Sequence, residues 1–398
     1  MQLTIRSYIS GSREENFMET RKYSKSVIIL FLLLVFGFTA VTFVWPDRTF
    51  SENENRVLAS APEFSWESLF EGKFMSDYET YITDQFFLRD EWIKIKTRTE
   101  MLLNKQDING VYMGKDGYLI ERHEDSEIDF EMLEKSKNYL VQFVERYTKR
   151  LGADNVKVML VPTASEVLLD KLPPFAEGFD QNGLIDEVYG LLPEGVAVDV
   201  RDILKEHADE YIYYKTDHHW TSLGAFYAYQ AYCRANGMEV PALSDATFTE
   251  VSDEFLGTVY SKLNLDISKD SMHTVTLPNT PSKIQMTVDM AEKFNSLYND
   301  EFLSQKDKYS YYLDGNHALT EIASNSEGKG TLLIIKDSYS HCFAPLTLGD
   351  YQKVYLVDFR YFNMPISQFI MQYRVTDILV LYNAVTFATD THTGAFVR

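Results

Sequence analysis

The chain has 398 residues, of which 45% are hydrophobic and 14% aromatic, which is enough for one large buried core or one domain with an insertion. Its formal net charge of −21 and its lack of any basic stripe exclude proteins that bind nucleic acid through an electropositive surface. The two cysteines, Cys233 and Cys342, are too few for a disulfide framework, although the sequence allows one disulfide bridge between them.

An apolar segment without any charge occupies residues 27–45. About 20 apolar residues cross a bilayer as a helix, and Trp45-Pro46-Asp47-Arg48 offers no signal-peptide cleavage site. The positive-inside rule then predicts a cytoplasmic tail at 1–26, a single-pass anchor in the cell membrane at 27–45 and an extracytoplasmic remainder. A buried core helix is the alternative. The tail's basic residues are Arg6, Arg13, Arg21, Lys22 and Lys25.

Two further segments follow the anchor. Apolar residues recur at helical spacing over 65–104, which predicts a membrane-proximal helical segment at 46–105. The extracytoplasmic domain is expected at 106–398. It opens with a hairpin, because the short apolar runs 111–113 and 118–120 flank a Gly-Lys-Asp-Gly turn.

From residue 130 onwards the pattern is that of an α/β domain, with a central parallel sheet covered by helices in a three-layer arrangement. The elements alternate along the chain. The expected strands are 156–161, 196–200, 332–335, 354–357 and 377–381, and the expected helices are 130–150, 222–236, 341–348 and 366–373.

Residues 242–320 interrupt this alternation with polar, mixed sequence and predict an insertion near the functional site. The insertion ends in a tyrosine-rich run from Tyr309 to His317. Two interpretations of these tyrosines are open: stacking on sugars, or packing within a small β-subdomain.

The richest chemistry lies in two short strings, Thr216-Asp217-His218-His219-Trp220 and Lys336-Asp337-Ser338-Tyr339. A serine hydroxyl becomes a nucleophile when an imidazole removes its proton, and a carboxylate must fix the tautomer of that imidazole. Asp217 and His219 have the spacing for such a pair, and Ser338 follows a buried strand. These strings therefore predict a Ser-His-Asp triad.

A second observation places further residues near Ser338. In parallel sheets, ligands bind beyond the carboxyl ends of the strands. Ser338, the run from Asp358 to Tyr361, and Asn383 all follow predicted strands directly. We therefore expect them to line one crevice. Within it, two roles are open for Arg360: orienting a substrate or anchoring Asp358.

The Asp-His-His string also has two non-catalytic interpretations. It could ligate a metal, but a structural or catalytic site needs three or four protein ligands, and no second cluster of clear spacing occurs. It could equally form a structural hydrogen-bond network beneath Trp220. We expect neither a metal nor another cofactor.

Asp217-His218-His219-Trp220, Lys336-Asp337-Ser338-Tyr339 and the early run from Phe50 to Arg56 carry a family resemblance. They resemble the bacterial DHHW family, which is similar to the SGNH-like polysaccharide O-acetyltransferases of the alginate type. The resemblance covers most of residues 50–398. Because the Asp-His pair precedes the serine, it implies the circularly permuted SGNH-like fold. Lys336 stands where those enzymes carry glycine.

The resemblance implies an extracytoplasmic O-acetyltransferase that modifies a cell-surface polysaccharide through an acyl-serine intermediate. Ser338 would be the nucleophile, His219 the proton relay and Asp217 the orienting acid. Asn383 would donate to the oxyanion, with Arg360 as a substrate-binding or oxyanion residue. A membrane-bound O-acyltransferase partner would supply the acyl group.

Two alternatives belong beside this function. A carbohydrate esterase would use the same triad with water as acceptor. A non-catalytic envelope protein would bind glycan through the aromatic insertion, and its Asp-His pair would be structural.

Overall fold

The structure is a computed structural model that describes residues 2–51, 56–265, 267–328 and 330–398, with backbone alone at 2–22 and 56. The chain divides into two compact units, Met1–Ile95 and Lys96–Arg398, each described by itself.

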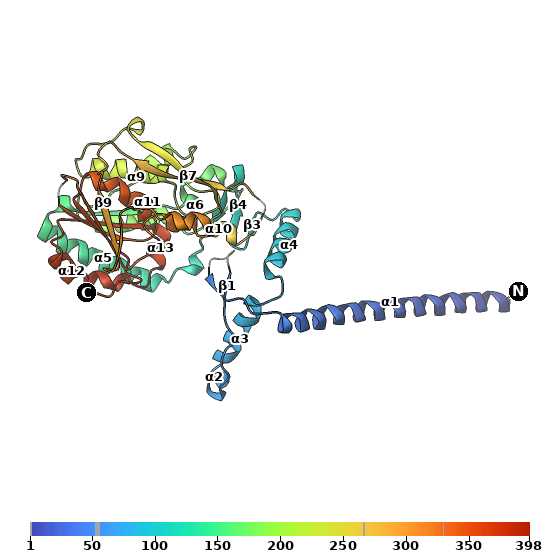
Figure 1. Cartoon of the computed structure of the whole chain (residues 1–398). Helices are drawn as coiled ribbons and strands as arrows, with labels where there is room; N and C mark the ends of the chain where they lie inside the picture. Colours follow the sequence, from blue (N-terminus) through green and yellow to red (C-terminus); the bar gives the residue numbers. More distant parts are fainter. Residues whose placement is uncertain (1, 52–55, 266, 329) are drawn as a thin grey trace. The chain divides into compact units, whose positions relative to one another are not determined.

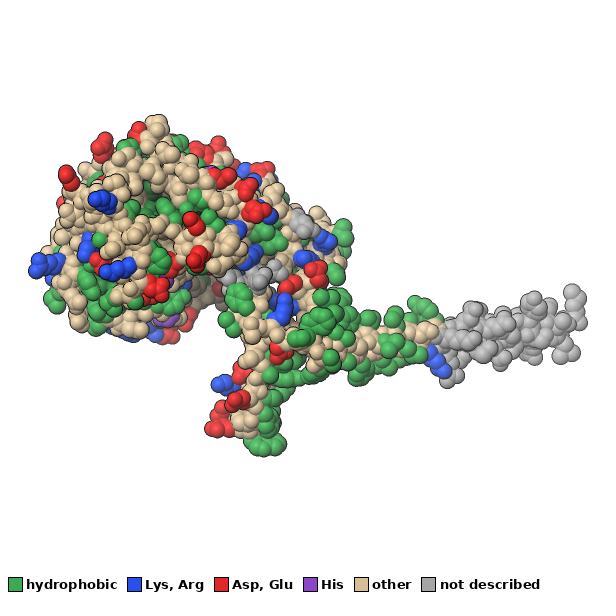
Figure 2. Space-filling model, in the orientation of Figure 1, with side chains coloured by type: hydrophobic (Ala, Val, Ile, Leu, Met, Phe, Trp, Pro, Cys, Tyr) green, Lys and Arg blue, Asp and Glu red, His purple; other side chains and the backbone are tan. Residues whose placement is uncertain are grey.

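The first unit is dominated by helix α1 (Gln2–Val44), seen in Figure 1. Its part from Tyr23 to Val44 is long and apolar enough to cross a membrane. The hydrophobic side chains of this part are exposed (Figure 2), as expected for a surface that lipid would cover. The remaining elements are β1 (Phe50–Ser51), β2 (Arg56–Val57), α2 (Trp66–Phe70), α3 (Lys73–Asp84) and the start of α4 (Arg89–Leu102).

The second unit is built on a seven-stranded sheet with the strand order β10-β9-β11-β13-β12-β14-β6. The last four strands in this order are parallel, and the first three extend the sheet in antiparallel fashion. The strands are β6 (Val156–Val161), β9 (Ile284–Val288), β10 (Glu292–Phe294), β11 (Leu319–Ser324), β12 (Thr331–Lys336), β13 (Lys353–Val357) and β14 (Asp377–Asn383).

Both faces of this sheet are buried. Successive side chains of its apolar strands point to opposite sides, so each strand contributes to a core on either face. In β12, Leu332 and Ile334 enter one core, whereas Leu333 and Ile335 enter the other. The first core also takes side chains from α8 (Arg201–Glu206), α9 (Ser222–Ala235) and α11 (Ser340–Phe343). The second takes them from α5 (Phe130–Leu151), α7 (Gln181–Leu191), α12 (Ile366–Gln372) and α13 (Ala384–Thr389). The result is a mixed α/β unit with three layers (Figure 1).

Two small sheets accompany the central one. The first joins β3 (Asp107–Ile108), β4 (Val111–Met113) and β5 (Leu119–Glu121), and includes the predicted hairpin. The second pairs β7 (Thr247–Phe255) with β8 (Asp270–Thr276). Two short helices, α6 (Ala164–Val167) and α10 (Thr258–Ser261), complete the unit.

The structure differs from the sequence expectations at two places. The predicted strand at 196–200 makes one parallel bridge, between Ala197 and Val158, and does not form a strand. The expected parallel sheet is parallel in four strands only, because β9, β10 and β11 extend it in antiparallel fashion. Their sequences mix polar and apolar residues and are only partly buried, so they lack the continuous apolar run that marks a strand buried on both faces.

Candidate functional site

Asp217 and His219 lie in a loop that Tyr213 and Trp220 close by pairing in antiparallel fashion. The loop leads directly into α9, whose first turn is capped by the side chain of Thr221. Both functional side chains are buried, with exposed fractions of 3% for Asp217 and 4% for His219. The loop therefore holds a carboxylate and an imidazole, two residues apart, away from bulk water.

A second segment fixes the Asp217 carboxylate. Thr258, the first residue of α10, donates to Asp217 Oδ2 from its N–H at 2.9 Å and from its hydroxyl at 3.1 Å. Gly257 approaches the same carboxylate so closely that an added Cβ would lie 2.3 Å from Asp217 Oδ2. Sequence reasoning missed both residues, because they follow Asp217 by about 40 residues in a polar stretch without a recognisable motif.

Ser338 occupies the turn between β12 and α11. The Asp337 carboxylate holds this turn, because it accepts hydrogen bonds from the N–H groups of Tyr339 at 2.9 Å and Asn383 at 2.7 Å. Burial raises the pKa of Asp337 to about 6. Ser338 is half-buried, whereas its neighbours from Lys336 to Ser340 are buried. The turn therefore leaves one hydroxyl partly accessible between buried neighbours.

The three predicted residues come together in one hydrogen-bonded chain. His219 Nδ1 lies 2.5 Å from Asp217 Oδ1, and His219 Nε2 lies 2.7 Å from Ser338 Oγ. Asp217 Oδ1 also accepts the backbone N–H of His219 at 3.0 Å. Because ionised Asp217 only accepts, Nδ1 must carry the proton, which leaves Nε2 as the acceptor facing the serine hydroxyl.

Two reciprocal hydrogen bonds join the histidine loop to the serine turn. Trp220 Nε1 donates to the Tyr339 carbonyl at 2.9 Å, and the Tyr339 hydroxyl donates to the His218 carbonyl at 2.5 Å. Both aromatic side chains are fully buried. The spacing between His219 and Ser338 is thus set by two buried polar anchors, each costly to leave unpaired.

Tyr309 forms one wall of the site. Its ring stacks on His219 with centroids 3.7 Å apart and planes 10° apart, and its hydroxyl donates to the Ser338 carbonyl at 3.2 Å. Tyr309, Tyr311 and Tyr312 are 6%, 5% and 1% exposed. The tyrosine run therefore packs in the core around the triad, which favours the packing interpretation over stacking on sugars.

The surroundings of Asp217 and His219 lower the pKa values of both side chains. Burial, supported by the charge of His218, lowers the pKa of His219 to about 4, against the opposing effect of Asp217. The pKa of Asp217 is lowered despite burial, because the two histidines and the Thr258 N–H favour the carboxylate. At neutral pH the pair is therefore an ionised acid beside a neutral imidazole.

Lys336 and Arg360 converge on Asp358 at the ends of β12 and β13. Lys336 Nζ lies 3.3 Å from Asp358 Oδ2, and Arg360 binds both carboxylate oxygens, at 2.9 Å and 2.5 Å. Lys336 also donates to Asn316 Oδ1 at 3.1 Å and contacts His341 Nε2 at 2.9 Å. Burial lowers the pKa of Lys336, which is 2% exposed. Arg360 therefore anchors Asp358, and its role in orienting a substrate stays a prediction.

Asn383 does lie beside the serine turn, but its carboxamide faces the turn's own scaffold. Its Nδ2 donates to Asp337 Oδ2 at 2.8 Å and to Thr386 Oγ1 at 2.6 Å, and its Oδ1 caps α13 by accepting from Thr386 N–H at 2.8 Å. Both amide hydrogens are thus engaged. Donation to an oxyanion would require one of these hydrogens to leave Asp337 or the Thr386 hydroxyl, so the expected role does not fit this arrangement.

His218 has a separate position. Its Nδ1 bonds to Thr258 Oγ1 at 2.7 Å, and its ring lies 3.8 Å from that of His219. Ligand atoms of Asp217, His218 and His219 lie within 4.8 Å of one another, which is the spacing a metal ion would need. Binding one would break the contacts of His219 with Asp217 or Ser338, so this donor set fits a hydrogen-bonded triad better than a metal site.

Two of three similar solved structures support the fold. A DHHW family protein from Eubacterium siraeum is 24% identical, covers 73% of this chain and 95% of its own, and has a TM-score of 0.60. Bacillus cereus PatB1, solved with a sulfonyl adduct, is 19% identical over 71% of this chain and 97% of its own, with a TM-score of 0.59. The O-acetyltransferase domain of Pseudomonas putida AlgJ is 14% identical over 71% and 93%, with a TM-score of 0.41.

Sequence comparison gives the family. No functionally curated protein matches the chain. The family model described as DHHW protein matches residues 124–357, more than half of the chain, and this range includes Asp217, His219 and Ser338. The protein therefore belongs to the DHHW family.

Proposed function

We propose that the protein is a membrane-anchored, extracytoplasmic O-acyltransferase that transfers an acetyl group to a cell-surface polysaccharide through an acyl-Ser338 intermediate. The observation that carries the proposal is the hydrogen-bonded chain from Asp217 through His219 to Ser338. The choice of acetyl and polysaccharide follows from the sequence resemblance to the alginate-type enzymes. The Asp-His pair precedes the serine, as in the circularly permuted SGNH-like arrangement.

In the first half-reaction, Ser338 Oγ attacks the acyl carbon of the donor while its proton passes to His219 Nε2. The tetrahedral intermediate collapses when the donor's leaving group takes that proton, which leaves an ester on Ser338. In the second half-reaction, a hydroxyl of the glycan gives its proton to His219 and attacks the ester. The new ester forms on the glycan, and Ser338 Oγ recovers the proton.

The oxyanion needs a donor beside Ser338. No described residue accepts the backbone N–H of Ser338, so this group is available to the tetrahedral intermediate. A donor of this kind contributes about 2.7–4 kcal/mol of transition-state stabilisation. Asn383 acts as a positioning residue, because it holds the Asp337 carboxylate that shapes the turn.

The proposal also includes the location of the protein and the source of its acyl group. The apolar part of α1 anchors the protein in the cell membrane with its N-terminal tail in the cytoplasm, and the Ser338 site lies outside. A membrane-bound O-acyltransferase presents the acyl group on the outer surface of the membrane. The protein needs no metal or other cofactor, since the triad supplies nucleophile, base and orienting acid.

The experiment uses full-length protein in detergent with an activated acetyl ester. We expect acetate or acetyl transfer to appear with the parent protein and to be lost in Ser338→Ala, with unchanged thermal unfolding. Ser340→Ala, which alters a buried hydroxyl two residues away, is the matched control and should retain turnover. Equal turnover in the parent and Ser338→Ala would refute the assignment.

The esterase alternative uses the same triad, and the partial exposure of Ser338 is the observation in its favour, because water can reach the ester. Product analysis with a glycan acceptor decides between the two. A transferase yields acetylated glycan in preference to acetate, whereas an esterase yields acetate alone and removes acetyl groups from acetylated glycan.

A further inference from the structure

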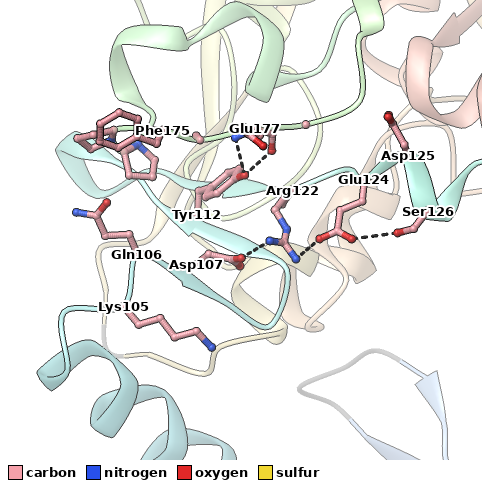
Figure 3. A pocket seen from close by; sticks show the side chains of 14 residues that line it. Lys105, Gln106, Asp107, Tyr112, Arg122, Glu124, Asp125, Ser126, Phe175 and Glu177 are labelled. Atoms are coloured by element: carbon pink, nitrogen blue, oxygen red, sulfur yellow. Dashed lines mark hydrogen bonds and ion pairs between the residues drawn. The ribbon is translucent and has the colours of Figure 1, made fainter.

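A groove of about 630 Å³ lies in the second unit, outside the triad (Figure 3). It is formed by the β3–β5 sheet and the segment from Pro173 to Gly178. In Figure 3, Phe175 and Gln106 lie at one side, Glu124 and Ser126 at the other, with Tyr112 between them. The triad as described makes no use of this groove.

Phe175 is the most unusual residue of the groove. Its side chain is 99% exposed, and its backbone has a φ of +63°, a region that bulky residues rarely adopt. No described aromatic residue stacks on its ring. The segment itself is fixed, because the hydroxyl of Tyr112 donates to the Glu177 carbonyl at 2.5 Å and accepts from its N–H at 3.1 Å. A firmly held backbone thus presents an uncovered aromatic face at the groove.

The polar lining supplies hydrogen-bonding groups and a negative balance of charge. Arg122 is held between Asp107 and Glu124, so its charge is already neutralised. The carboxylates of Asp125 and Glu177 and the amide of Gln106 are exposed, and none has a side-chain partner among the described residues. Free carboxylates repel an anionic ligand, and this repulsion adds to that of the chain as a whole, whose net charge is −21.

An open groove with one exposed aromatic ring and free carboxylate and amide groups matches the chemistry of a sugar ring. The axial C–H bonds of a pyranose pack on an aromatic face, and its hydroxyls donate to carboxylates and exchange hydrogen bonds with amides. A membrane surface fits less well, because a single phenylalanine amid acidic groups gains little from anionic lipid.

The groove is connected to the triad through β5. This strand ends at Glu121, immediately before Arg122, and it packs against α10, whose Thr258 holds Asp217. Lys262, directly after α10, forms an ion pair with Glu121. The groove and the acid end of the triad therefore share β5 and α10 as their support.

We propose that the groove beside Phe175 binds an uncharged stretch of polysaccharide and thereby holds the acceptor next to the triad. The role as acceptor rests on the proposed function, whereas the binding itself does not. The inference narrows the substrate class to a neutral glycan and excludes a polyuronate as the polymer held here.

The test measures binding to full-length Ser338→Ala protein in detergent, so that no acyl transfer takes place. A panel of immobilised neutral and uronate oligosaccharides identifies the bound glycans, and titration calorimetry then measures the best of them. We expect binding to neutral oligosaccharides that changes little with salt. In the same background, Phe175→Ala should weaken it by about tenfold or more, since one stacking contact is lost.

Two matched variants control for folding and for the aromatic face. Phe130→Ala removes another exposed phenylalanine, on α5, and should bind as the parent does. Phe175→Trp keeps an aromatic face and should retain binding. The proposal is overturned if no neutral glycan binds, if Phe175→Ala binds as tightly as Phe130→Ala, or if uronate oligosaccharides bind equally well. Phe175-dependent binding to lipid vesicles without glycan binding would assign the ring to the membrane.

These outcomes are independent of the proposed function. Turnover of a small acetyl ester tests Ser338 without the groove, and glycan binding by Ser338→Ala tests the groove without catalysis. An active enzyme that binds no neutral glycan would overturn the groove assignment alone, and an inactive protein that binds glycan through Phe175 would overturn the enzyme alone.

Discussion

At the residue scale, the site depends on one hydrogen-bond partner for each ring nitrogen of His219. Nδ1 faces a carboxylate that Thr258 holds with two hydrogen bonds, and Nε2 faces the Ser338 hydroxyl. Burial keeps the imidazole neutral, which is the protonation state that a general base requires. His218 Nδ1 lies 3.8 Å from Asp217 Oδ1, against 2.5 Å for His219, and its ring forms no hydrogen bond with Ser338 among the described residues, so the two histidines should differ greatly in their importance.

The first prediction compares these histidines. His219→Ala should lower turnover of an acetyl ester by roughly 10⁴- to 10⁶-fold, because the base is lost. His218→Ala removes one hydrogen bond with Thr258 and should cost about tenfold at most. Steady-state kinetics of both purified variants provides the check. Equal losses, together with bound metal in the parent, would favour a metal site instead.

The second prediction concerns pH. Protonated His219 cannot accept the serine proton, and its lowered pKa keeps it neutral until the solution becomes acidic. The kcat/KM for an acetyl ester should therefore rise with a midpoint at about pH 4 and stay level through neutral pH. His218→Ala should move the midpoint upwards, because the charge of His218 lowers the pKa of His219. A parent midpoint near 6.5, the value of an unperturbed histidine, would contradict the described environment.

At the element scale, the site is assembled where elements distant in sequence meet: the loop before α9, the start of α10 and the turn after β12. Trp220 and Tyr339 lock the first to the third, and Gly257 allows the second to approach Asp217. Such close approach of backbone to a carboxylate is possible only without a side chain.

The third prediction tests this approach. In Gly257→Ala, the new Cβ would overlap the Asp217 carboxylate, so Asp217 must shift away from His219. Turnover should fall by about 10²-fold, the usual result of a misplacement near 1 Å. Gly190→Ala, on α7 with open space around the new methyl group, is the matched control and should be fully active. Full activity in Gly257→Ala would show that Asp217 needs no fixed position.

The sequence predicted the elements whose patterns are local. The apolar run of β6 and the amphipathic pattern of α5 agree with the structure to within a residue, because burial on a sheet or along a helix face leaves a regular period. It did not predict β9, β10 or β11, whose mixed polar and apolar residues form no continuous run, or the contacts of Thr258 and Tyr309. Those contacts depend on tertiary folding, which no local spacing records.

In the candidate site, too, the sequence predicted the residues that stand in a local motif. Asp217, His219 and Ser338 stand in short strings whose chemistry is readable, and the structure brings them together. The expected oxyanion role of Asn383 could not be checked from sequence, since a strand-end asparagine serves equally well as a helix cap. Phe175 escaped notice because a single exposed phenylalanine has no sequence signature.

At the scale of the whole molecule, the two units differ in the hydrophobic surface that they expose. The apolar part of α1 exposes hydrophobic side chains over the length of a membrane span, whereas the unit from Lys96 to Arg398 buries two continuous cores. The chain's acidic balance limits close contact of exposed surfaces with anionic lipid headgroups. Tethering by α1, and not surface charge, therefore provides the expected attachment to the membrane.

The fourth prediction tests the orientation of this tether. A reporter enzyme that is active only after export, fused behind Arg398, should be active, because the basic residues before the span keep the tail in the cytoplasm. The same reporter fused after Lys25 should be inactive. The reverse pattern would place the triad in the cytoplasm and refute the extracytoplasmic assignment.

The central claim is that Ser338 carries the acyl group. The most direct measurement is mass spectrometry of full-length protein quenched in acid during turnover of an activated acetyl ester. We predict one acetyl group on the peptide that contains Ser338, its absence in Ser338→Ala, and its accumulation when acceptor is withheld. An acetyl group on another residue, or turnover without any acylated Ser338, would show that Ser338 is not the nucleophile.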